Sequence, residues 1–424
     1  MTLHAFNSDI QFVNPLVLNA GDAVVIGVNG FVYGQDTLFL GQTGNDILVA
    51  GGVASWLTAF SFGISGQVQG AAIQLADNGL IQAYQALFYN GVNLVFHNAG
   101  TIMTDTVALS LRGSAELGSA SRIDNSGSIV SGGIAAIYGR AGQTEPYSIH
   151  NTGVIASTSI YAVLFDDTDV VNDRLINAGQ IVGTVAMGGG SDLYDARGGG
   201  TVDGTIGGGL GDDRFRPGAA EEVFSGDAGI DTLDFRGGGG AVVIALDSGW
   251  EAGGWAEGDI WTGIENVTGT RGADRIGGDG QNNRLFGAAG NDTIFGAAGG
   301  DVLEGGDGND VFSGGAGNDI FVYRRLGEIG DLISDFSSAA AGNDDRFLIS
   351  AAGFGGGLSA GTLATTRFRT RADNLAQDGD DRFIFRTTDR TLWFDADGTG
   401  STAAVMVADL QANATVTAGD IVIF

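Results

Sequence analysis

A nine-residue repeat constrains the fold of this chain more than any other feature of its sequence. From Gly269 to Val322 the chain runs through six consecutive nonapeptides without an insertion. Position 1 is Gly in all six, position 4 is Gly in five, and position 8 is apolar throughout. Because Gly tolerates positive φ and close backbone approach, the first six residues of each unit favour a turn. The last three favour a short strand whose middle side chain points inward, so two units predict one coil of a parallel solenoid.

Position 6 of these repeats is acidic in five units and amide-bearing in one. The residues concerned are Asp274, Asn283, Asp292, Asp301, Asp310 and Asp319. Residues two repeats apart stack on neighbouring coils about 4.8 Å apart, and unneutralised carboxylates at that spacing repel each other. A hard dication with six or more oxygen ligands would cancel the repulsion, using the carboxylates and the turn carbonyls that Gly leaves exposed. The pattern therefore predicts cations between the turns.

An earlier block repeats the design less regularly. A run of three consecutive nonapeptides begins at Gly208, and its position-6 residues are Asp213, Glu222 and Asp231. Asp192 stands in the same relation 21 residues before Asp213, which is two repeats plus a three-residue insertion. The middle repeat departs from the pattern, because Pro and Ala replace its glycines and Glu is longer than Asp.

The pattern G-G-x-G-x-D-x-U-x resembles the RTX, or hemolysin-type, family of calcium-binding β-roll proteins, which type I secretion exports. The resemblance implies several Ca²⁺ ions between turns on both edges of a β-roll. Carried over residue by residue, one edge would hold Asp274, Asp292 and Asp310, and the other Asn283, Asp301 and Asp319. In the earlier block the implied metal ligands are Asp192, Asp213 and Asp231. Asn283 departs from the acid of the family.

The N-terminal half follows a longer period. Asn-x-Gly recurs at Asn98, Asn125, Asn151 and Asn177, at intervals of 27, 26 and 26 residues, each time flanked by alternating apolar residues. Asn and Gly are turn residues that accept left-handed conformations. A coil of about 26 residues with one stacked Asn-Gly turn predicts a parallel β-helix, in which stacking buries a shared core. The repeated Asn predicts a ladder of side-chain amides between coils.

These signals together predict an all-β chain folded as a parallel β-solenoid. An N-terminal β-helix is followed by calcium-binding RTX β-roll blocks and a C-terminal β cap. We expect the β-helix over 1–185, the β-roll over 186–335 and the cap over 336–424. The roll divides into blocks at 187–235 and 269–322, joined by an interlude of strands.

Export from the cell is the next expectation. The first residues lack the basic and apolar regions of a Sec signal, and no apolar stretch is long enough for a transmembrane segment. An acid followed by apolar residues at the C-terminal end, Asp420 to Phe424, resembles the uncleaved signal read by the type I secretion machinery. We therefore expect a secreted protein that is extracellular or at the cell surface.

Composition excludes several functions. The chain has 50 acidic and 20 basic residues, a net charge of -30, and every basic residue is Arg. This charge repels nucleic acid. The absence of Lys excludes a P-loop and Schiff-base chemistry, and the absence of Cys excludes disulfides and thiolate metal sites. There is no H-E-x-x-H motif, and the G-x-S-x-G match at 357–361 lies in the expected β cap and not between a strand and a helix, as a lipase nucleophile would, so protease and lipase activities are not predicted.

The sequence leaves two functions to weigh. The first is a secreted calcium-binding RTX protein whose folding is driven by extracellular Ca²⁺. It would serve as a structural, surface-layer, matrix or adhesion component of a Gram-negative bacterium, with self-association or cell-surface polysaccharide as further partners. The alternative is a polysaccharide-acting β-helix enzyme of the lyase or epimerase type, carrying an RTX secretion module. Four arginines fall one per coil, Arg112, Arg122, Arg140 and Arg174, so converging Arg, Asp and Tyr on the outer face of residues 60–185 would favour the enzyme.

Overall fold

The chain forms two compact units in the computed structural model. The structure describes residues 2–12, 14–34, 39–41, 44–62, 68–112, 120–142, 145–168, 170–247, 253–339 and 343–424. Unit 1 comprises Met1–Asp231 with Asp259–Gly263, and unit 2 comprises Thr232–Gly258 with Ile264–Phe424. The three-part division expected from the sequence stays a prediction.

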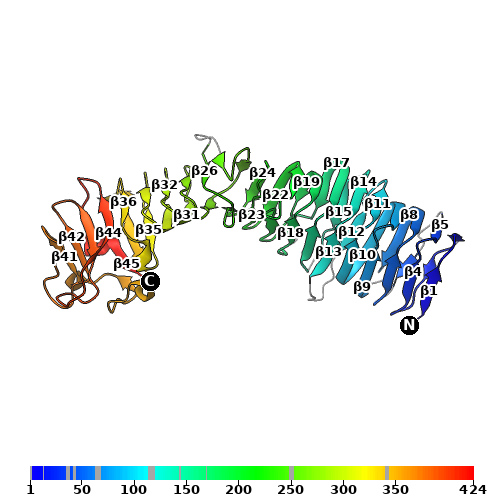
Figure 1. Ribbon diagram of the computed structural model, residues 1–424, viewed down its shortest axis with the longest axis horizontal. Coiled ribbons are helices and arrows are strands. Elements are labelled where there is room, and N and C mark those ends of the chain that lie inside the picture. Colours follow the sequence, from blue (N-terminus) through cyan, green and yellow to red (C-terminus); the bar gives the residue numbers. More distant parts are fainter. Residues whose placement is uncertain are drawn as a thin grey trace. The chain divides into compact units, whose positions relative to one another are not determined.

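Unit 1 is a stack of coils in which each strand pairs in parallel with a strand of the neighbouring coil (Figure 1). The strands form columns that run along the stack. The first column contains β1 (Leu3–Phe6), β4 (Ala23–Ile26), β7 (Asp46–Val49), β9 (Val68–Leu75), the end of β10 (Leu80–Asn98), β13 (Ser121–Asn125), β16 (Tyr147–Asn151), β18 (Arg174–Asn177), β20 (Leu193–Asp195) and β23 (Arg214–Arg216).

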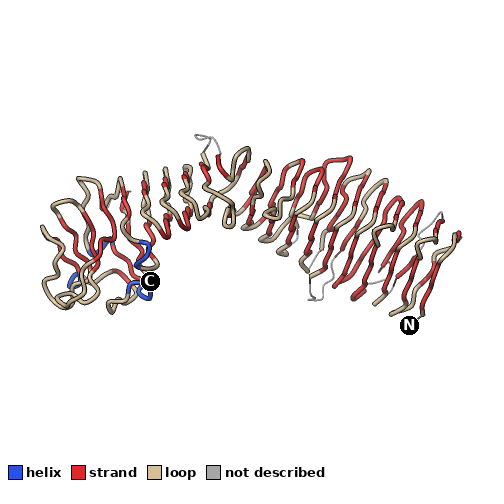
Figure 2. The backbone as a smooth tube through the Cα atoms, in the orientation of Figure 1, coloured by secondary structure: helices blue, strands red, loops and turns tan. Residues whose placement is uncertain are grey.

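The other strands of unit 1 follow the same parallel order on the remaining side of each coil, where longer strands turn a corner (Figure 2). They are β2 (Ile10–Phe12), β3 (Leu16–Val17), β5 (Phe31–Gly34), β6 (Phe39–Gly41), β8 (Gly52–Phe62), the start of β10, β11 (Thr101–Thr104), β12 (Leu109–Arg112), β14 (Ser128–Ser131), β15 (Ala135–Gly139), β17 (Val154–Leu164), β19 (Gln180–Ala186), β21 (Thr201–Asp203), β22 (Thr205–Leu210), β24 (Val223–Ala228) and β28 (Ile260–Thr262).

The register of unit 1 explains the long sequence period. Ile123 pairs with Ile149, and Ile149 pairs with Leu175, so one inward row recurs every 26 residues. All three side chains are fully buried. Each such side chain contributes about 1.5–3 kcal/mol of hydrophobic stabilisation. The rows meet inside the stack, so coils that could not hold a core alone share one.

The predicted amide ladder is confirmed. The side-chain Nδ2 of Asn98 donates to Oδ1 of Asn125 at 2.7 Å, Asn125 to Asn151 at 2.8 Å, and Asn151 to Asn177 at 2.9 Å. The Gly of each Asn-x-Gly turn lies directly against the turn one coil earlier. A Cβ built at Gly153 would collide with the carbonyl oxygen of Gly127, so only Gly lets the turns stack.

Unit 2 begins with the nonapeptides, which form two parallel columns. One contains β26 (Val242–Ala245), β30 (Arg275–Gly277), β32 (Thr293–Phe295), β34 (Val311–Ser313) and β36 (Asp331–Ile333). The other contains β25 (Thr232–Asp234), β29 (Asn266–Thr268), β31 (Arg284–Ala289), β33 (Val302–Asp307), β35 (Ile320–Tyr323) and β39 (Arg346–Ile349). From β29 to β35 the paired residues are 18 apart, and every position-8 side chain in Gly269–Val322 is buried, as the pattern predicts.

The C-terminal strands extend both columns. β45 (Ile421–Ile423) pairs in parallel with β39, and β44 (Val405–Leu410) pairs in parallel with β36. Beyond β44 the sheet continues through β43 (Thr391–Phe394), β42 (Phe383–Arg386) and β41 (Phe368–Arg371). Short elements complete the unit: β27 (Gly253–Gly254), β37 (Ser338–Ala339), β38 (Asn343–Asp344), β40 (Gly361–Thr362), α1 (Ala351–Phe354) and the 3-10 turns at Leu326–Glu328, Thr365–Arg367 and Ala418–Asp420.

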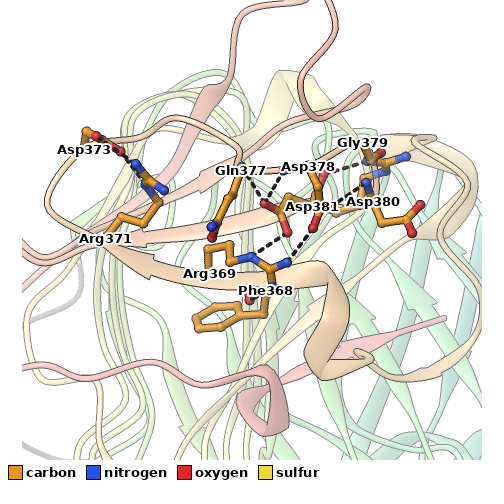
Figure 3. A network of polar contacts seen from close by, with 10 residues as sticks. Phe368, Arg369, Arg371, Asp373, Gln377, Asp378, Gly379, Asp380 and Asp381 are labelled. Carbon is orange, nitrogen blue, oxygen red and sulfur yellow. Dashed lines mark hydrogen bonds and ion pairs between the residues drawn. The ribbon is translucent and has the colours of Figure 1, made fainter.

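A polar network fixes the loop between β41 and β42 (Figure 3). The fully buried Asp381 accepts the backbone N–H of Gln377 at 2.6 Å through Oδ2, while its Oδ1 lies 3.0 Å from Nε of Arg369. Arg369 also donates from Nη2 to Asp378 at 2.8 Å. The planar guanidinium reaches two carboxylates at once, which a Lys ammonium does not do in a fixed geometry.

The parallel pairing of successive coils in both units shows that the parallel β-solenoid predicted from the sequence is the observed fold.

Candidate metal centre

Position 6 of every nonapeptide lies directly before a strand, and its side chain bonds to the coil before it. In unit 2, Oδ1 of Asp292 accepts the backbone N–H of Asp274 at 2.7 Å, and Oδ1 of Asp310 accepts that of Asp292 at 2.7 Å. On the other edge, Asp301 accepts from Asn283 at 2.8 Å and Asp319 accepts from Asp301 at 2.9 Å. The structure therefore brings these six residues into the two edge ladders expected from the resemblance.

The same ladder is present in unit 1. Oδ1 of Asp213 accepts the backbone N–H of Asp192 at 2.7 Å, and Oδ1 of Asp231 accepts that of Asp213 at 2.7 Å. The three-residue insertion between Asp192 and Asp213 leaves this contact intact. Asp173, which the nonapeptide pattern does not contain, continues the ladder, because its backbone N–H donates to Oδ1 of Asp192 at 2.6 Å.

The second carboxylate oxygen of most ladder residues is left over. Among the described residues, buried Oδ2 atoms that accept no hydrogen bond from the protein include those of Asp192, Asp213, Asp259, Asp292, Asp301, Asp310 and Asp319. Burying an ionised oxygen without a partner is costly. The arrangement therefore calls for a positive partner at each of these atoms.

Backbone oxygens gather at the same places. A Cβ built at Gly287 would collide with Oδ2 of Asp292 and lie 2.8 Å from the carbonyl oxygen of Gly305, one coil further on. A Cβ built at Gly296 would likewise collide with Oδ2 of Asp301 and with the carbonyl oxygen of Gly314. The position-1 glycines thus open a cradle between carboxylate and carbonyl oxygens of successive coils. Hard, oxygen-only donors of this kind suit Ca²⁺, so the residues fit the ion that the resemblance implies.

Burial raises the pKa of the ladder carboxyls. Loss of solvation raises the pKa of Asp292 and of Asp301 to about 7, and that of Asp310 and of Asp213 to about 6. It raises the pKa of Asp192 to about 8, with the neighbouring carboxylates Asp173 and Asp213 adding to the effect. A bound cation would reverse these shifts, because it stabilises the charged form.

Two of the predicted ligands differ from the others. Asp274 uses both oxygens within the protein: Oδ2 accepts the N–H of Thr270 at 2.6 Å, and Oδ1 accepts that of Val242 at 2.8 Å. The side chain of Asn283 also bonds within the protein through both of its polar atoms. Its Oδ1 accepts the backbone N–H of Asp279 at 2.8 Å, and its Nδ2 donates to the backbone carbonyl of Glu265 at 3.0 Å. Both residues stand at the first rung of their edge, where the turn closes on itself.

Glu222, the longer acid of the irregular repeat, likewise uses both carboxylate oxygens within the protein. Its Oε2 accepts the N–H of Gly218 at 2.8 Å within the same turn, and its Oε1 accepts the hydroxyl of Tyr194 at 2.8 Å. The extra methylene therefore removes the carboxylate from the position that Asp oxygens take elsewhere in the ladder.

Sequence reasoning missed four ladder residues besides the repeats. Asp331 and Asp345 are the last rungs of the two ladders in unit 2. Oδ1 of Asp331 accepts the backbone N–H of Asp310 at 2.8 Å, and Oδ1 of Asp345 accepts that of Asp319 at 3.0 Å. Asp259 accepts from Glu222 at 2.9 Å, and Asp173 has been described above. Each is followed after one residue by an apolar strand residue, which is the local signal D-x-U. Insertions before them break the period of nine and hide that signal.

Among the residues that the structure describes, no three His, Asp or Glu side chains converge on one point. Backbone carbonyls must therefore supply part of any coordination shell at the ladders. Within the same described ranges, no helix is long and apolar enough to cross a membrane.

Ionisable side chains on the outer face of the β-helix form a line across coils. Nδ1 of His97 lies 2.8 Å from Oδ2 of Asp124, and Nδ1 of His150 lies 3.9 Å from its Oδ1. All three are outward neighbours in register. Two residues earlier on the same strands, Arg122 pairs in register with Ser148, and Ser148 pairs with Arg174, so a serine lies between the two arginines. Arg140 donates to Ser110 at 2.8 Å and follows β15, in the column that also contains Arg112, so the one-per-coil arginines are divided between two columns.

Comparison with known proteins agrees with the geometry. Residues 262–294 and 295–323 match the family of RTX calcium-binding nonapeptide repeats, with 4 copies in the family model. The chain therefore carries an RTX β-roll, and its repeats bind several Ca²⁺ ions. Proteins with such repeats are typically secreted.

Several solved structures match part of the chain. One of them is the AlgE6R3 subunit from the Azotobacter vinelandii mannuronan C5-epimerase, at 30% identity over 36% of this chain and 78% of that chain, with a TM-score of 0.23. A TM-score this low carries no argument about fold or function. A search of curated protein sequences finds no significant match.

Proposed function

We propose that the chain is a secreted protein whose β-roll folds when extracellular Ca²⁺ fills the aspartate ladders. The observation that carries the proposal is the row of buried Oδ2 atoms without a partner, which at Asp292 and Asp301 lie beside a carbonyl oxygen of the next coil. The proposed ligands are Asp192, Asp213, Asp231, Asp274, Asn283, Asp292, Asp301, Asp310 and Asp319. Those with an unpartnered buried Oδ2 have the strongest support.

The aspartates themselves make folding conditional. In the calcium-free chain each ladder carboxylate must either lose its charge or stay ionised beside like charges in a buried site, and both outcomes oppose folding. Ca²⁺ supplies, when bound, the positive charge that these oxygens lack. Because the unfolded chain has no preformed site, binding free energy becomes folding free energy. When the free Ca²⁺ concentration is about one hundred times the Kd of a site, binding at that site adds about 2.7 kcal/mol to the free energy of unfolding.

This dependence suits type I export. A chain that stays unfolded at low Ca²⁺ inside the cell can thread a channel, and it then folds at millimolar Ca²⁺ outside. We infer that the C-terminal segment ending at Phe424 is read by the type I secretion machinery and afterwards joins the roll as β45. The net charge of -30 keeps the calcium-free chain expanded by self-repulsion.

For the mature protein we propose a structural, matrix or adhesion role at the bacterial surface. The support is in the 26-residue coils of unit 1, where apolar rows and the Asn98–Asn177 ladder join one coil to the next. Such a stack is a rigid scaffold that can present its outer face repeatedly. The alternative role as a polysaccharide-acting enzyme is not favoured by the arginines, because Arg122 and Arg174 lie in one column of strands and Arg112 and Arg140 in the other.

Circular dichroism and thermal melting with Ca²⁺ and in chelator test the proposal. We expect loss of β-structure and a lower Tm in chelator, and recovery on adding Ca²⁺. Asp310→Asn should lower calcium affinity, because its Oδ2 is buried and unpartnered. Asp307→Asn is the matched control: it removes the same charge from the same repeat, but this side chain is 57% exposed and only pairs with Arg325. An unchanged Tm in chelator would contradict the proposal.

A further inference from the structure

Unit 1 has a groove on its outer face that none of the features above uses. It has a volume of about 480 Å³ and is lined by residues of β17, β19, β22 and β24, which are consecutive rungs of one column, and of the loops that follow β17 and β19. Its position coincides with the change from 26-residue coils to nonapeptide coils. It is therefore a local feature of the transition and not a repeat of the β-helix surface.

The floor of the groove comes from a fall in side-chain size along one outward row. In register, Leu164 is followed by Ala186, Gly207 and Ser225 on successive coils. At Gly207 nothing projects, and a Cβ built there would meet only Oδ2 of Asp227 at 3.1 Å and a backbone oxygen at 3.8 Å. The row therefore leaves backbone accessible, with the larger Leu164 as a wall at one end.

The walls combine one aromatic ring with hydrogen-bonding groups. Tyr161 lines the groove and pairs in register with Thr184, and Thr205 and Ser225 add further hydroxyls. An accessible aromatic face beside hydroxyl groups matches the two surfaces of a sugar ring, one apolar and one edged with hydroxyls.

Asp227 is held in place at backbone cost. It has a φ of 67°, a left-handed conformation that non-glycine residues rarely adopt. Its Oδ1 accepts the hydroxyl of Ser225 at 2.7 Å, and that serine is in turn reached by Thr262 at 3.4 Å. Strained residues whose side chains are fixed in this way are frequent at binding sites.

The charge of the groove selects among sugars. Asp167 and Asp227 are its charged residues, and none of the described residues that line it is basic. A uronate or phosphate chain would meet like charge there, whereas neutral sugar hydroxyls can donate to both carboxylates. We propose that this groove binds a neutral polysaccharide chain, with Tyr161 stacking on one ring and Asp227 accepting its hydroxyls.

This inference deepens the proposed surface role, and it rests on the proposed function because the groove adjoins a repeat block that we expect Ca²⁺ to order. β22 and β24 flank the aspartates of the first repeat block, so we expect the groove to be complete only with Ca²⁺ present. None of the ladder aspartates lines the groove, so sugar binding can fail while calcium-driven folding succeeds.

The test is calorimetric titration of the full chain, saturated with Ca²⁺, with a panel of neutral oligosaccharides built from glucose, mannose, galactose or N-acetylglucosamine. A mannuronate oligomer serves as the anionic arm. We expect at least one neutral series to bind and the mannuronate not to bind. Release of cleaved or epimerised sugar in the same mixtures would show turnover and would replace the binding role with an enzymatic one.

Three variants locate the binding. Gly207→Leu fills the floor without a positive-φ conflict and should abolish binding, and Tyr161→Ala should weaken it about tenfold through the lost stacking platform. Tyr84→Ala removes another exposed tyrosine outside the groove and should leave binding unchanged. Each variant is checked for an unchanged melting transition with Ca²⁺. Binding only of mannuronate, no binding across the panel, or equal losses for Tyr84→Ala and Tyr161→Ala would overturn the inference, while an intact calcium response would leave the proposed folding function standing.

Discussion

The β-helix and the β-roll solve the same problem with different polar residues. In each, a side chain next to a short strand bonds to the neighbouring coil at every rung. Asn125 of the helix both donates to Asn151 and accepts from Asn98, so its ladder satisfies itself. Asp292 of the roll is an acceptor only; it takes one N–H and has an oxygen left over. An amide ladder therefore folds unaided, whereas a carboxylate ladder depends on a cation.

The largest effect that follows is regional. Hydrogen exchange in chelator should accelerate strongly, by tenfold or more, for amides of β31 to β35. Amides of β13 to β18, held by the Asn ladder, should change little. Restoring Ca²⁺ should return protection to the roll. Equal acceleration in both regions would show that the two ladders do not differ as described.

Converting one ladder into the other is the second way to test the contrast. Asn151→Asp keeps the acceptor for Asn125 but places a buried carboxylate against Oδ1 of Asn177. We expect a loss of about 3 kcal/mol in unfolding free energy, measured by denaturant titration. The control is Asn291→Asp, at an exposed site where the acceptor alone is used, and it should stay within about 0.5 kcal/mol.

The pH dependence of the roll should change sign with calcium. In the calcium-free protein the pKa values of Asp292 and Asp301, about 7 in the fold, lie above the 3.8 of the free side chain. The fold then binds protons more tightly than the unfolded chain, so its stability is greatest below about pH 4 and falls as pH rises through about 7. With Ca²⁺ the ligands must be deprotonated, and calcium affinity should rise over the same range. Melting at about pH 5 and pH 8, with and without Ca²⁺, checks both signs.

The smallest expected effect concerns the turns. Ala288 has a φ of 86°, although the equivalent position two repeats later is Gly306. Ala288→Gly should relieve this strain and raise the free energy of unfolding by about 0.5–1 kcal/mol. Ala289→Gly, at a neighbouring residue without positive φ, should be destabilising instead. A stability loss in both variants would show that the turn at Ala288 is not strained.

How far the sequence predicts the structure depends on whether a period is unbroken. Six nonapeptides in succession define the roll, its inward rows and the edge on which each aspartate lies, because two repeats fit one coil. The period fails at Asp259, Asp331 and Asp345, where insertions precede the turn, although each joins the ladder through the same backbone bond. The groove was beyond prediction, since it arises from four residues on four coils whose alignment depends on coils of unequal length.

Asp292 and Asp301 each bond to the coil before them, and the carbonyl oxygens beside them belong to the coil after them, so a new pair of nonapeptides inserted into the array adds sites of the same kind. Eighteen residues are thus a self-contained module of duplication. Copy number can vary by unequal recombination within such a gene while the reading frame, register and metal chemistry are all conserved, and calcium capacity would then scale with the length of the array.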